Sequence, residues 1–317
     1  MADKPDRCIL PPLRPGDRVG VIAPASAAHE PDEVTAGIER LRQMGYRVYS
    51  DFDPDAPRGY LAAPDTDRLA ALNRTLADPD LKAIFCVRGG YGSLRLLRHL
   101  DYEAARKHPK LLIGYSDITA LQWALWTRAG WPSLSSLVVT EWGRADDDST
   151  DHFRRWVESD MPDFTAFDGS ALAPLSSGQA EGVVLGGNLA VLTRLLGTPY
   201  FPDVDGALLY LEEVQEAPYR VDRMLAHLDL AGVLDDLAGV VLGRFTTPDD
   251  VNQPSLTLDD VFADYFADRT YPVAAGLQYG HCLPRLSLPQ GLRAHLTVTP
   301  RNSTLTPLEP LTTPSAA

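Results

Sequence analysis

Hydrophobic and polar positions follow two different periods along the first 140 residues. Short apolar runs, as in a buried strand, alternate with longer segments in which apolar residues recur every three or four positions, as on a helix. In residues 31–44, for example, Val34, Ile38 and Leu41 share one face, and Gly45 follows as a helix stop. The expected strands are 18–24, 46–49, 81–87, 110–114 and 133–139, and the expected helices are 31–44, 65–76, 93–100 and the segment that follows Ser116. Strands that alternate with helices predict a parallel, doubly wound α/β sheet.

The pattern fades between residues 143 and 178, where acidic and loop-like sequence dominates, and it returns in a mixed form afterwards. We therefore predict an N-terminal domain over residues 1–142, a connecting segment over 143–178 and a C-terminal domain over 179–317. The C-terminal domain should be α+β. Its expected strands are 181–185, 207–211, 240–245 and 273–278, its helices are 188–196, 219–230 and 256–267, and a hairpin joins 295–299 to 303–306.

Residues 111–130, LLIGYSDITALQWALWTRAG, predict a strand that turns sharply into a helix at Ser116. In a nucleophile elbow, such a bend exposes the serine hydroxyl, and the amide of the next residue, here Asp117, is free to bind an oxyanion. The second glycine of the usual Gly-x-Ser-x-Gly pattern is missing. A simple helix cap at Ser116, with Asp117 complementing the helix dipole, is the alternative interpretation.

A serine nucleophile needs a base and an acid that orients the base. Among the seven histidines, His281 follows a predicted strand in a glycine-containing turn, where α/β sites gather. Glu212 and Glu213 follow another apolar strand. Alternation of side chains predicts that one of the two faces inward and the other outward. Solvated acids at the strand end and a structural histidine remain the alternatives.

The composition narrows the possible functions. The formal net charge of −14 argues against binding of nucleic acid or of an anionic membrane surface, because either would favour a basic patch. Three scattered cysteines are too few for a disulfide framework or a zinc site, and no apolar run approaches the roughly 18 residues of a membrane helix. With no signal peptide in the N-terminal sequence, we expect a cytoplasmic protein.

Two further motifs carry weaker signals. Residues 88–92, RGGYG, follow a strand as a phosphate-binding loop does, but they lack the Walker lysine and the dinucleotide fingerprint. The same glycines could instead bring the amide of Gly90 close to a ligand, as a second oxyanion donor beside Asp117. Cys86 lies within an expected buried strand, and Cys282 points away from its neighbour His281, so neither is expected to be a nucleophile.

Together these segments resemble the murein LD-carboxypeptidase family of serine peptidases, which includes the microcin C immunity peptidases. The likeness rests on VGVIAPAS near the start, VRGGYGS, LIGYSDITAL, and GGNL with LEEVQEAPYRVDRML in the second half. It spans the chain from about residue 15 to the final hairpin. The resemblance implies a flavodoxin-like N-terminal domain, a smaller and partly barrel-like C-terminal domain, and a homodimer.

The resemblance also implies a Ser-Glu-His triad. Ser116 matches the nucleophile, His281 the base and Glu212 the orienting acid, whereas Glu213 takes the place of an acid outside the triad. The oxyanion donors map onto the backbone amides of Gly90 and Asp117. No metal or organic cofactor is implied. In one place the chain departs from the family: Ser135-Ser136-Leu137 replaces a His-Gly-Pro turn that borders the pocket in relatives.

The implied activity is hydrolysis of the amide between an L-residue and a terminal D-amino acid in a short peptide, as in murein tetrapeptide recycling. Such a substrate needs a cation for its carboxylate, and the candidates are Arg88, Arg220, Arg223 and Arg244. One alternative is an immunity-like peptidase that cleaves a peptidyl-nucleotide, with Trp142 as an aromatic that stacks a base. Another is a non-catalytic ligand-binding protein on the same scaffold.

Overall fold

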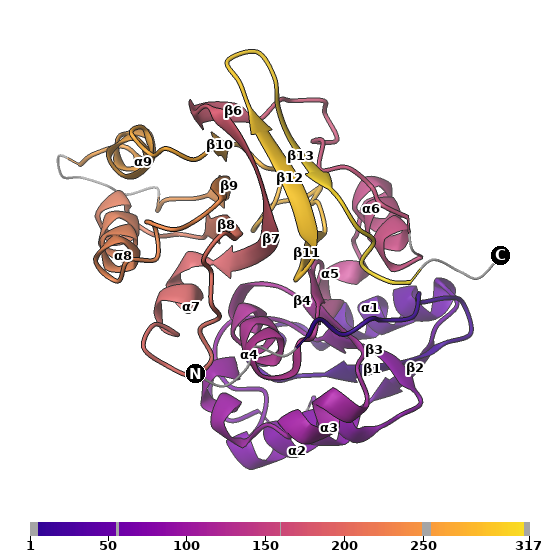
Figure 1. Ribbon diagram of the computed structural model, residues 1–317. Helices are drawn as coiled ribbons and strands as arrows, with labels where there is room; N and C mark the ends of the chain where they lie inside the picture. The colour runs from indigo at the N-terminus through magenta and orange to yellow at the C-terminus, as the bar shows by residue number, and fades with distance from the viewer. Residues whose placement is uncertain (1–5, 55–56, 159, 249–254, 314–317) are drawn as a thin grey trace.

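A computed structural model describes residues 6–54, 57–158, 160–248 and 255–313. It contains two β-sheets, one built mainly from the first half of the chain and the other from the second half (Figure 1). The fold class expected from the sequence is confirmed: a doubly wound, parallel-rich sheet is joined to a mixed sheet that is nearly barrel-shaped.

The first sheet has the strand order β2-β1-β3-β4-β5, which is the flavodoxin-like order, and these five strands are parallel. Its strands are β1 Arg18–Ile22, β2 Arg47–Ser50, β3 Leu81–Cys86, β4 Leu111–Gly114 and β5 Ser133–Ser135. A sixth strand, β11 (Leu288–Gln290), comes from the second half and pairs antiparallel with β5. The C-terminal part of the chain therefore completes the N-terminal sheet.

Helices cover both faces of this sheet. One apolar cluster joins α2, α3 and α4 to one face, and a second joins α1, α5 and α6 to the other. The helices are α1 Pro31–Gln43, α2 Asp65–Ala77, α3 Tyr102–Lys107, α4 Thr119–Ala129, α5 Val139–Trp142 and α6 Asp147–Val157. Gly37 lets α1 and α5 approach closely, because a Cβ at this position would lie 1.8 Å from the carbonyl oxygen of Val139.

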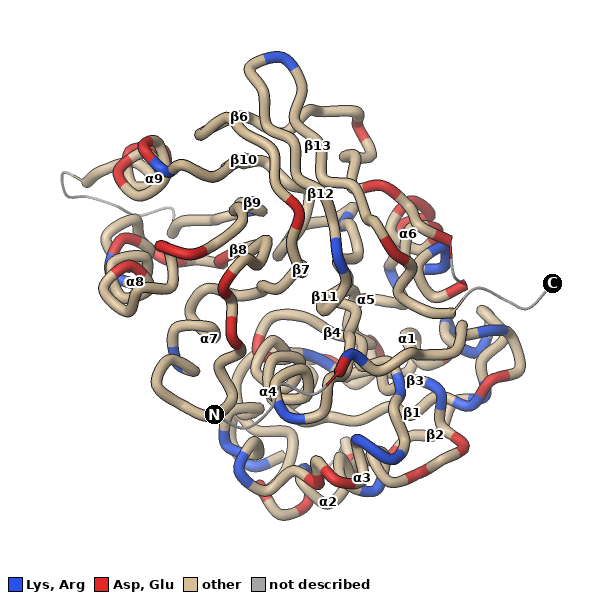
Figure 2. The backbone as a smooth tube through the Cα atoms, viewed as in Figure 1, with Lys and Arg blue, Asp and Glu red and all other residues tan. Residues whose placement is uncertain are grey.

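The second sheet has the order β13-β12-β7-β8-β9-β10-β6, with β7 to β10 parallel and the outer pairs antiparallel. Its strands are β6 Ala173–Ser176, β7 Gly178–Asn188, β8 Leu208–Glu213, β9 Gly239–Phe245, β10 Val273–Ala275, β12 Arg293–Val298 and β13 Ser303–Pro307. Helices α7 (Leu189–Thr193), α8 (Pro218–Leu230) and α9 (Leu258–Phe266) follow β7, β8 and β9. Acidic and basic residues are interspersed along the outer helices (Figure 2).

Three sequence-based expectations need correction. The segment expected to be a loop-like connection contains α6 and β6. Helix α6 forms because Phe153, Trp156 and Val157 make a fully buried face on an otherwise polar segment. The strand expected to reach residue 139 ends at Ser135, and α5 begins at residue 139. The helix expected over residues 93–100 is instead two 3-10 turns, η1 (Ser93–Arg95) and η2 (Leu97–His99). The division into domains at residues 142 and 178 stays a prediction.

Candidate active site

Ser116 occupies the bend between β4 and the following helix. Its φ of +64° lies in the left-handed region, which a non-glycine residue rarely adopts, and the 3-10 turn η3 (Ser116–Ile118) then leads into α4. A Cβ on Gly89 would lie 2.8 Å from Ser116 Cβ, so the loop after β3 packs directly against this bend. Within the described chain, the Ser116 side chain makes no capping hydrogen bond. The backbone therefore has the shape of an elbow and presents the side chain to a cavity.

The loop that contains Gly89 and Gly90 packs against the start of η3. A Cβ on Gly89 would lie 3.2 Å from the amide nitrogen of Asp117, which places the glycine loop beside the start of η3. Gly90 has a φ of +96°, and a Cβ here would lie 2.4 Å from Ser26 Oγ. In the part of the chain that the structure describes, neither the Gly90 nor the Asp117 amide donates to a protein acceptor. Both amides are thus available to a ligand.

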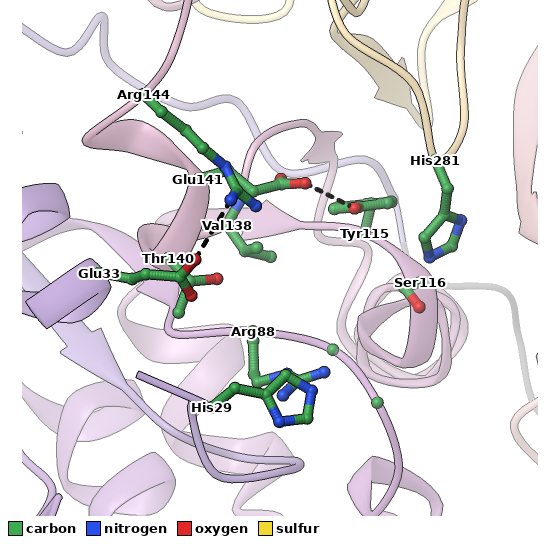
Figure 3. Close-up of a pocket in the computed structure, with 12 residues that line it drawn as sticks. His29, Glu33, Arg88, Tyr115, Ser116, Val138, Thr140, Glu141, Arg144 and His281 are labelled. Atoms are coloured by element: carbon green, nitrogen blue, oxygen red, sulfur yellow. Dashed lines mark hydrogen bonds and ion pairs between the residues drawn. The ribbon is translucent and has the colours of Figure 1, made fainter. Parts of the chain in front are cut away.

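Glu212, near the end of β8, and His281, in the loop that follows β10, meet beside Ser116. Glu212 is fully buried at the end of β8, and its Oε2 lies 2.8 Å from His281 Nδ1. Asn188 donates its side-chain amide to the other carboxylate oxygen at 3.2 Å. Gly280 allows this approach, because a Cβ on it would lie 3.0 Å from Glu212 Oε2. The carboxylate therefore holds one imidazole nitrogen and leaves the other directed toward Ser116 (Figure 3).

Glu213 is also buried, which contradicts the expectation that one of the two glutamates faces outward. All six residues of β8 are buried, so the strand is covered on both faces and alternation brings neither glutamate to solvent. The Glu213 carboxylate accepts hydrogen bonds from the Asn188 side chain at 2.9 Å, from the Ala190 amide at 2.7 Å and from the Val214 amide at 2.9 Å. Burial raises the pKa of Glu213 despite these bonds.

A second buried cluster supports the histidine. The ring of Tyr115, the residue before the elbow serine, lies 4.9 Å from the His281 ring, and the Arg285 guanidinium lies 3.7 Å from the Tyr115 ring centre. Glu141 Oε1 accepts from the Tyr115 hydroxyl and from Arg285 Nη2, both at 2.8 Å. Burial opposes ionisation of Glu141, but the Arg285 charge and these hydrogen bonds lower its pKa.

Sequence reasoning missed this cluster. Its only signal is that Glu141 and Arg285 are single charged residues within apolar stretches, VVTEWG and CLPRLSL. A charge in such a place is buried only with a partner.

Ser116, His281 and both glycines border one cavity of about 220 Å³ (Figure 3). The cavity lies at the carboxyl ends of the strands of the first sheet, where ligands of open α/β sheets bind. Its lining residues are His29, Glu33, Arg88, Gly89, Gly90, Tyr115, Ser116, Val138, Thr140, Glu141, Arg144 and His281.

The arginines that the sequence suggested for binding the substrate carboxylate lie in different places. Of the four candidate arginines, Arg88 lines the cavity, whereas Arg220, Arg223 and Arg244 are exposed side chains outside its lining. Arg144, which the sequence argument did not propose, lines it as well.

Trp142 was expected at the pocket edge as a stacking aromatic, and this is wrong. It is fully buried, with its ring against Phe85 and Phe153, because α5 turns this side chain into the core under the first sheet.

The departure at residues 135–137 also lies off the cavity. Ser135 and Ser136 are buried and hydrogen-bonded to Tyr279 and Ser287, and Leu137 belongs to the core. It is Val138 and Thr140, slightly further along, that reach the cavity.

Neither cysteine near the site has the environment of a nucleophile. Burial raises the pKa of Cys86 and of Cys282, which keeps both as thiols. Among the described residues, no group of three His, Cys, Asp or Glu side chains could hold a metal ion. No helix in the described ranges is long and apolar enough to cross a membrane.

Comparisons with known proteins decide the family. Residues 19–136 match the LD-carboxypeptidase N-terminal domain, and residues 181–296 match the LD-carboxypeptidase C-terminal domain. A probable murein peptide carboxypeptidase of Bacillus subtilis is 35% identical over 296 residues, which cover 92% of each chain. This chain belongs to the LD-carboxypeptidase family. It is a serine-type carboxypeptidase, and the resemblance drawn from its motifs is confirmed.

Relatives of both expected kinds are found within the LD-carboxypeptidase family. The crystal structure of a muramoyltetrapeptide carboxypeptidase from Oxalobacter formigenes is 29% identical, with a TM-score of 0.80, and the match covers 92% of this chain and 99% of that one. The microcin C7 self-immunity protein MccF of Escherichia coli is 25% identical, over 93% of this chain and 94% of its own. The chain is thus similar to murein peptidases and to an immunity protein.

Proposed function

We propose that this enzyme removes the terminal D-amino acid from a short peptide by hydrolysing the amide that joins it to an L-residue. The substrate we favour is a murein tetrapeptide that ends in D-alanine, and the reaction passes through an acyl-enzyme on Ser116. One observation carries the proposal. The strained elbow of Ser116 borders the same cavity as His281, whose Nδ1 is bound at 2.8 Å by the buried Glu212.

In the first step, His281 takes the proton from Ser116 as the hydroxyl oxygen attacks the peptide carbonyl. Glu212 keeps Nδ1 protonated, so that Nε2 is the free base, and its charge stabilises the imidazolium that forms. The carboxylate suits this role because it is fully buried and already receives a hydrogen bond from Asn188. A side chain held from two directions loses little entropy when the reaction begins.

The carbonyl oxygen becomes negatively charged in the tetrahedral intermediate. The amides of Gly90 and Asp117 are its proposed donors, because neither donates to an acceptor among the described residues and their loops meet at Ser116. Losing one such donor typically costs about 10²–10³ in rate. His281 then protonates the leaving amine, the D-amino acid departs, and a water molecule activated by His281 hydrolyses the ester on Ser116.

The alternative substrate is a peptidyl-nucleotide, by analogy with the immunity relatives. Its leaving group is much larger than one amino acid and needs an aromatic surface for the base. The cavity is smaller than the roughly 300–1,000 Å³ usual for drug-sized ligands, at about 220 Å³. Trp142 is buried in the core, and the ring of Tyr115 is held by Arg285 and Glu141. These features favour the smaller leaving group.

The deciding experiment incubates the enzyme with an L-lysyl-D-alanine peptide and, separately, with a peptidyl-adenylate analogue. We expect release of D-alanine and little cleavage of the adenylate. Preferential cleavage of the adenylate would select the immunity-like function. Labelling of Ser116 by a serine-directed phosphonate separates both activities from a non-catalytic ligand-binding role, which predicts no adduct.

We further propose that the enzyme works in the cytoplasm and as a homodimer, as its family resemblance implies. Light scattering on the purified chain should give a mass of about twice the 34.6 kDa of the monomer. A mass equal to the monomer across the micromolar range contradicts the dimer.

A further inference from the structure

A carboxypeptidase must distinguish the last residue of a peptide from an internal one. The distinguishing chemical group is the free carboxylate on the leaving residue, and a protein binds such a group best with an arginine. In the proposed reaction this carboxylate carbon is three bonds from the carbonyl carbon that Ser116 attacks, or roughly 3–4 Å through space. Its cation must therefore lie close to the oxyanion donors.

Arg88 lies close to one of the proposed oxyanion donors, Gly90. It immediately precedes the glycine pair after β3, and a Cβ built on Gly90 would lie 3.9 Å from Arg88 Nε. The side chain is only partly exposed and lines the cavity on the side opposite His281 (Figure 3). Its guanidinium is anchored by one hydrogen bond, from Nη1 to the carbonyl oxygen of Ala27 at 3.0 Å. In the described ranges of the chain, Nε and Nη2 have no protein partner.

Arg144 is the other arginine of the cavity, and it is a weaker candidate. Its Nη1 lies 3.2 Å from Glu33 Oε1, so a carboxylate of the protein already occupies it. Its side chain is 62% exposed, and solvent screens an interaction at such a site. A substrate carboxylate would have to compete with Glu33 for Arg144, whereas it meets open N–H groups at Arg88.

We infer that Arg88 binds the terminal carboxylate of the departing D-residue, and that this contact makes the enzyme a carboxypeptidase. The inference rests on the proposed function and adds the residue that recognises the substrate's end. The cavity then holds the leaving residue under His281, the group that protonates its amine. A longer peptide is rejected because its next residue replaces the charged oxygen that Arg88 binds.

The test compares two substrates that differ in one group: a peptide ending in L-lysyl-D-alanine and the same peptide ending in D-alanine amide. Wild-type enzyme should prefer the free acid. Arg88→Ala should reduce kcat/KM for the acid by about 10- to 100-fold, the range of a lost charged hydrogen bond. The kcat/KM for the amide should change little. Arg88→Lys should restore part of the preference. Arg223→Ala, an exposed arginine outside the cavity, should leave both values unchanged.

Several outcomes contradict the inference. An unchanged acid preference in Arg88→Ala overturns it, as does loss of the preference in Arg144→Ala instead. An equal loss on both substrates overturns it too, because Arg88 would then act on the glycine loop. Unchanged phosphonate labelling of Ser116 in Arg88→Ala shows that the elbow is intact.

A further arm tests which side of the substrate the cavity holds. Peptides with L-lysine or L-diaminopimelate before the D-alanine differ by a carboxylate on the acyl side. If Arg88→Ala changes this preference and not the acid-to-amide one, Arg88 faces the acyl side and the inference fails. Wild-type enzyme that releases no D-alanine at all overturns the proposed function itself, a result that none of the arginine variants can produce.

Discussion

The guanidinium carbon of Arg285 lies 3.7 Å from the centre of the Tyr115 ring. Arg285 is four residues beyond His281 in the sequence. Tyr115 in turn precedes Ser116. This stacking therefore links the segment that carries the proposed base to the segment that carries the proposed nucleophile. Glu141, from a third segment, binds both partners at 2.8 Å. The two halves of the chain are thus fixed to each other next to the cavity.

Breaking this cluster should cost stability. Arg285 and Glu141 side chains are 1% and 12% exposed, so removing one partner leaves a buried charge without its counterion. Arg285→Met should lower the free energy of unfolding by about 3–5 kcal/mol, measured by urea denaturation. The double variant Arg285→Met with Glu141→Gln should lose at least ~1 kcal/mol less than the sum of the single losses. Strict additivity would contradict a direct interaction.

Glu212 and Glu213 are neighbours with different proposed roles, so the same substitution can be compared at both positions. Glu212→Gln should reduce kcat by about 10⁴-fold, because an amide can no longer hold the required imidazole tautomer. Glu213→Gln should act mainly on stability, since Glu213 binds backbone amides and Asn188 rather than His281. Steady-state kinetics and thermal unfolding of both variants separate the two roles. Equal catalytic losses would mean that the triad assignment of Glu212 is incorrect.

Gly89 should tolerate no side chain. A methyl group here would lie 2.8 Å from Ser116 Cβ and 3.2 Å from the Asp117 amide nitrogen. Gly89→Ala should therefore displace the nucleophile from its donors and lower kcat by about 10²-fold or more, as displacements near 1 Å do. The rate of phosphonate labelling should fall in parallel. A variant with normal turnover would show that the elbow and the glycine loop move independently of catalysis.

The buried side chain of His152 should make the stability of the folded protein depend on pH. It lies buried in α6, with Nε2 at 3.0 Å from the Asp163 carbonyl oxygen and Nδ1 accepting from the Ser287 amide, and burial lowers its pKa to about 4. The unfolded chain takes up this proton near pH 6.5. Stability from the neutral imidazole is therefore complete above pH 6.5 and is lost as the pH falls from 6.5 to 4, by up to roughly 3 kcal/mol.

The matching measurement compares the wild type with His152→Gln by urea denaturation between pH 7.5 and pH 4. Because the variant lacks the titrating group, its stability deficit should shrink as the pH falls. A deficit that stays constant over this range would contradict the burial of a neutral His152.

The sequence predicted the regular elements best where the apolar period is unbroken. The helix expected over residues 31–44 is α1, Pro31–Gln43, and the strand expected over 81–87 is β3, Leu81–Cys86. Helix α6 was missed because its buried face is embedded in charged residues. Strand β11 is only three residues long, and its partner, β5, lies more than 150 residues earlier in the chain. Such a pairing leaves no local signal.

The same limit applies to the site. Ser116, Glu212 and His281 were proposed because each follows a predicted apolar strand and corresponds to a triad residue of the family. Arg285 and Arg144 have no such local mark, since their roles come from contacts with residues far away in the sequence. Burial of Glu213 depends on the elements that cover both faces of β8, which the order of residues within the strand does not reveal. Local patterns thus predicted the candidates, and only the tertiary structure gives their partners.

The most direct test of the account is release of D-alanine from an L-lysyl-D-alanine peptide by the wild type and by Ser116→Ala at equal concentrations. We expect steady release by the wild type and a loss of about 10⁶-fold in the variant, as when a triad acts as a unit. Ser116→Ala that releases D-alanine at the wild-type rate would contradict it.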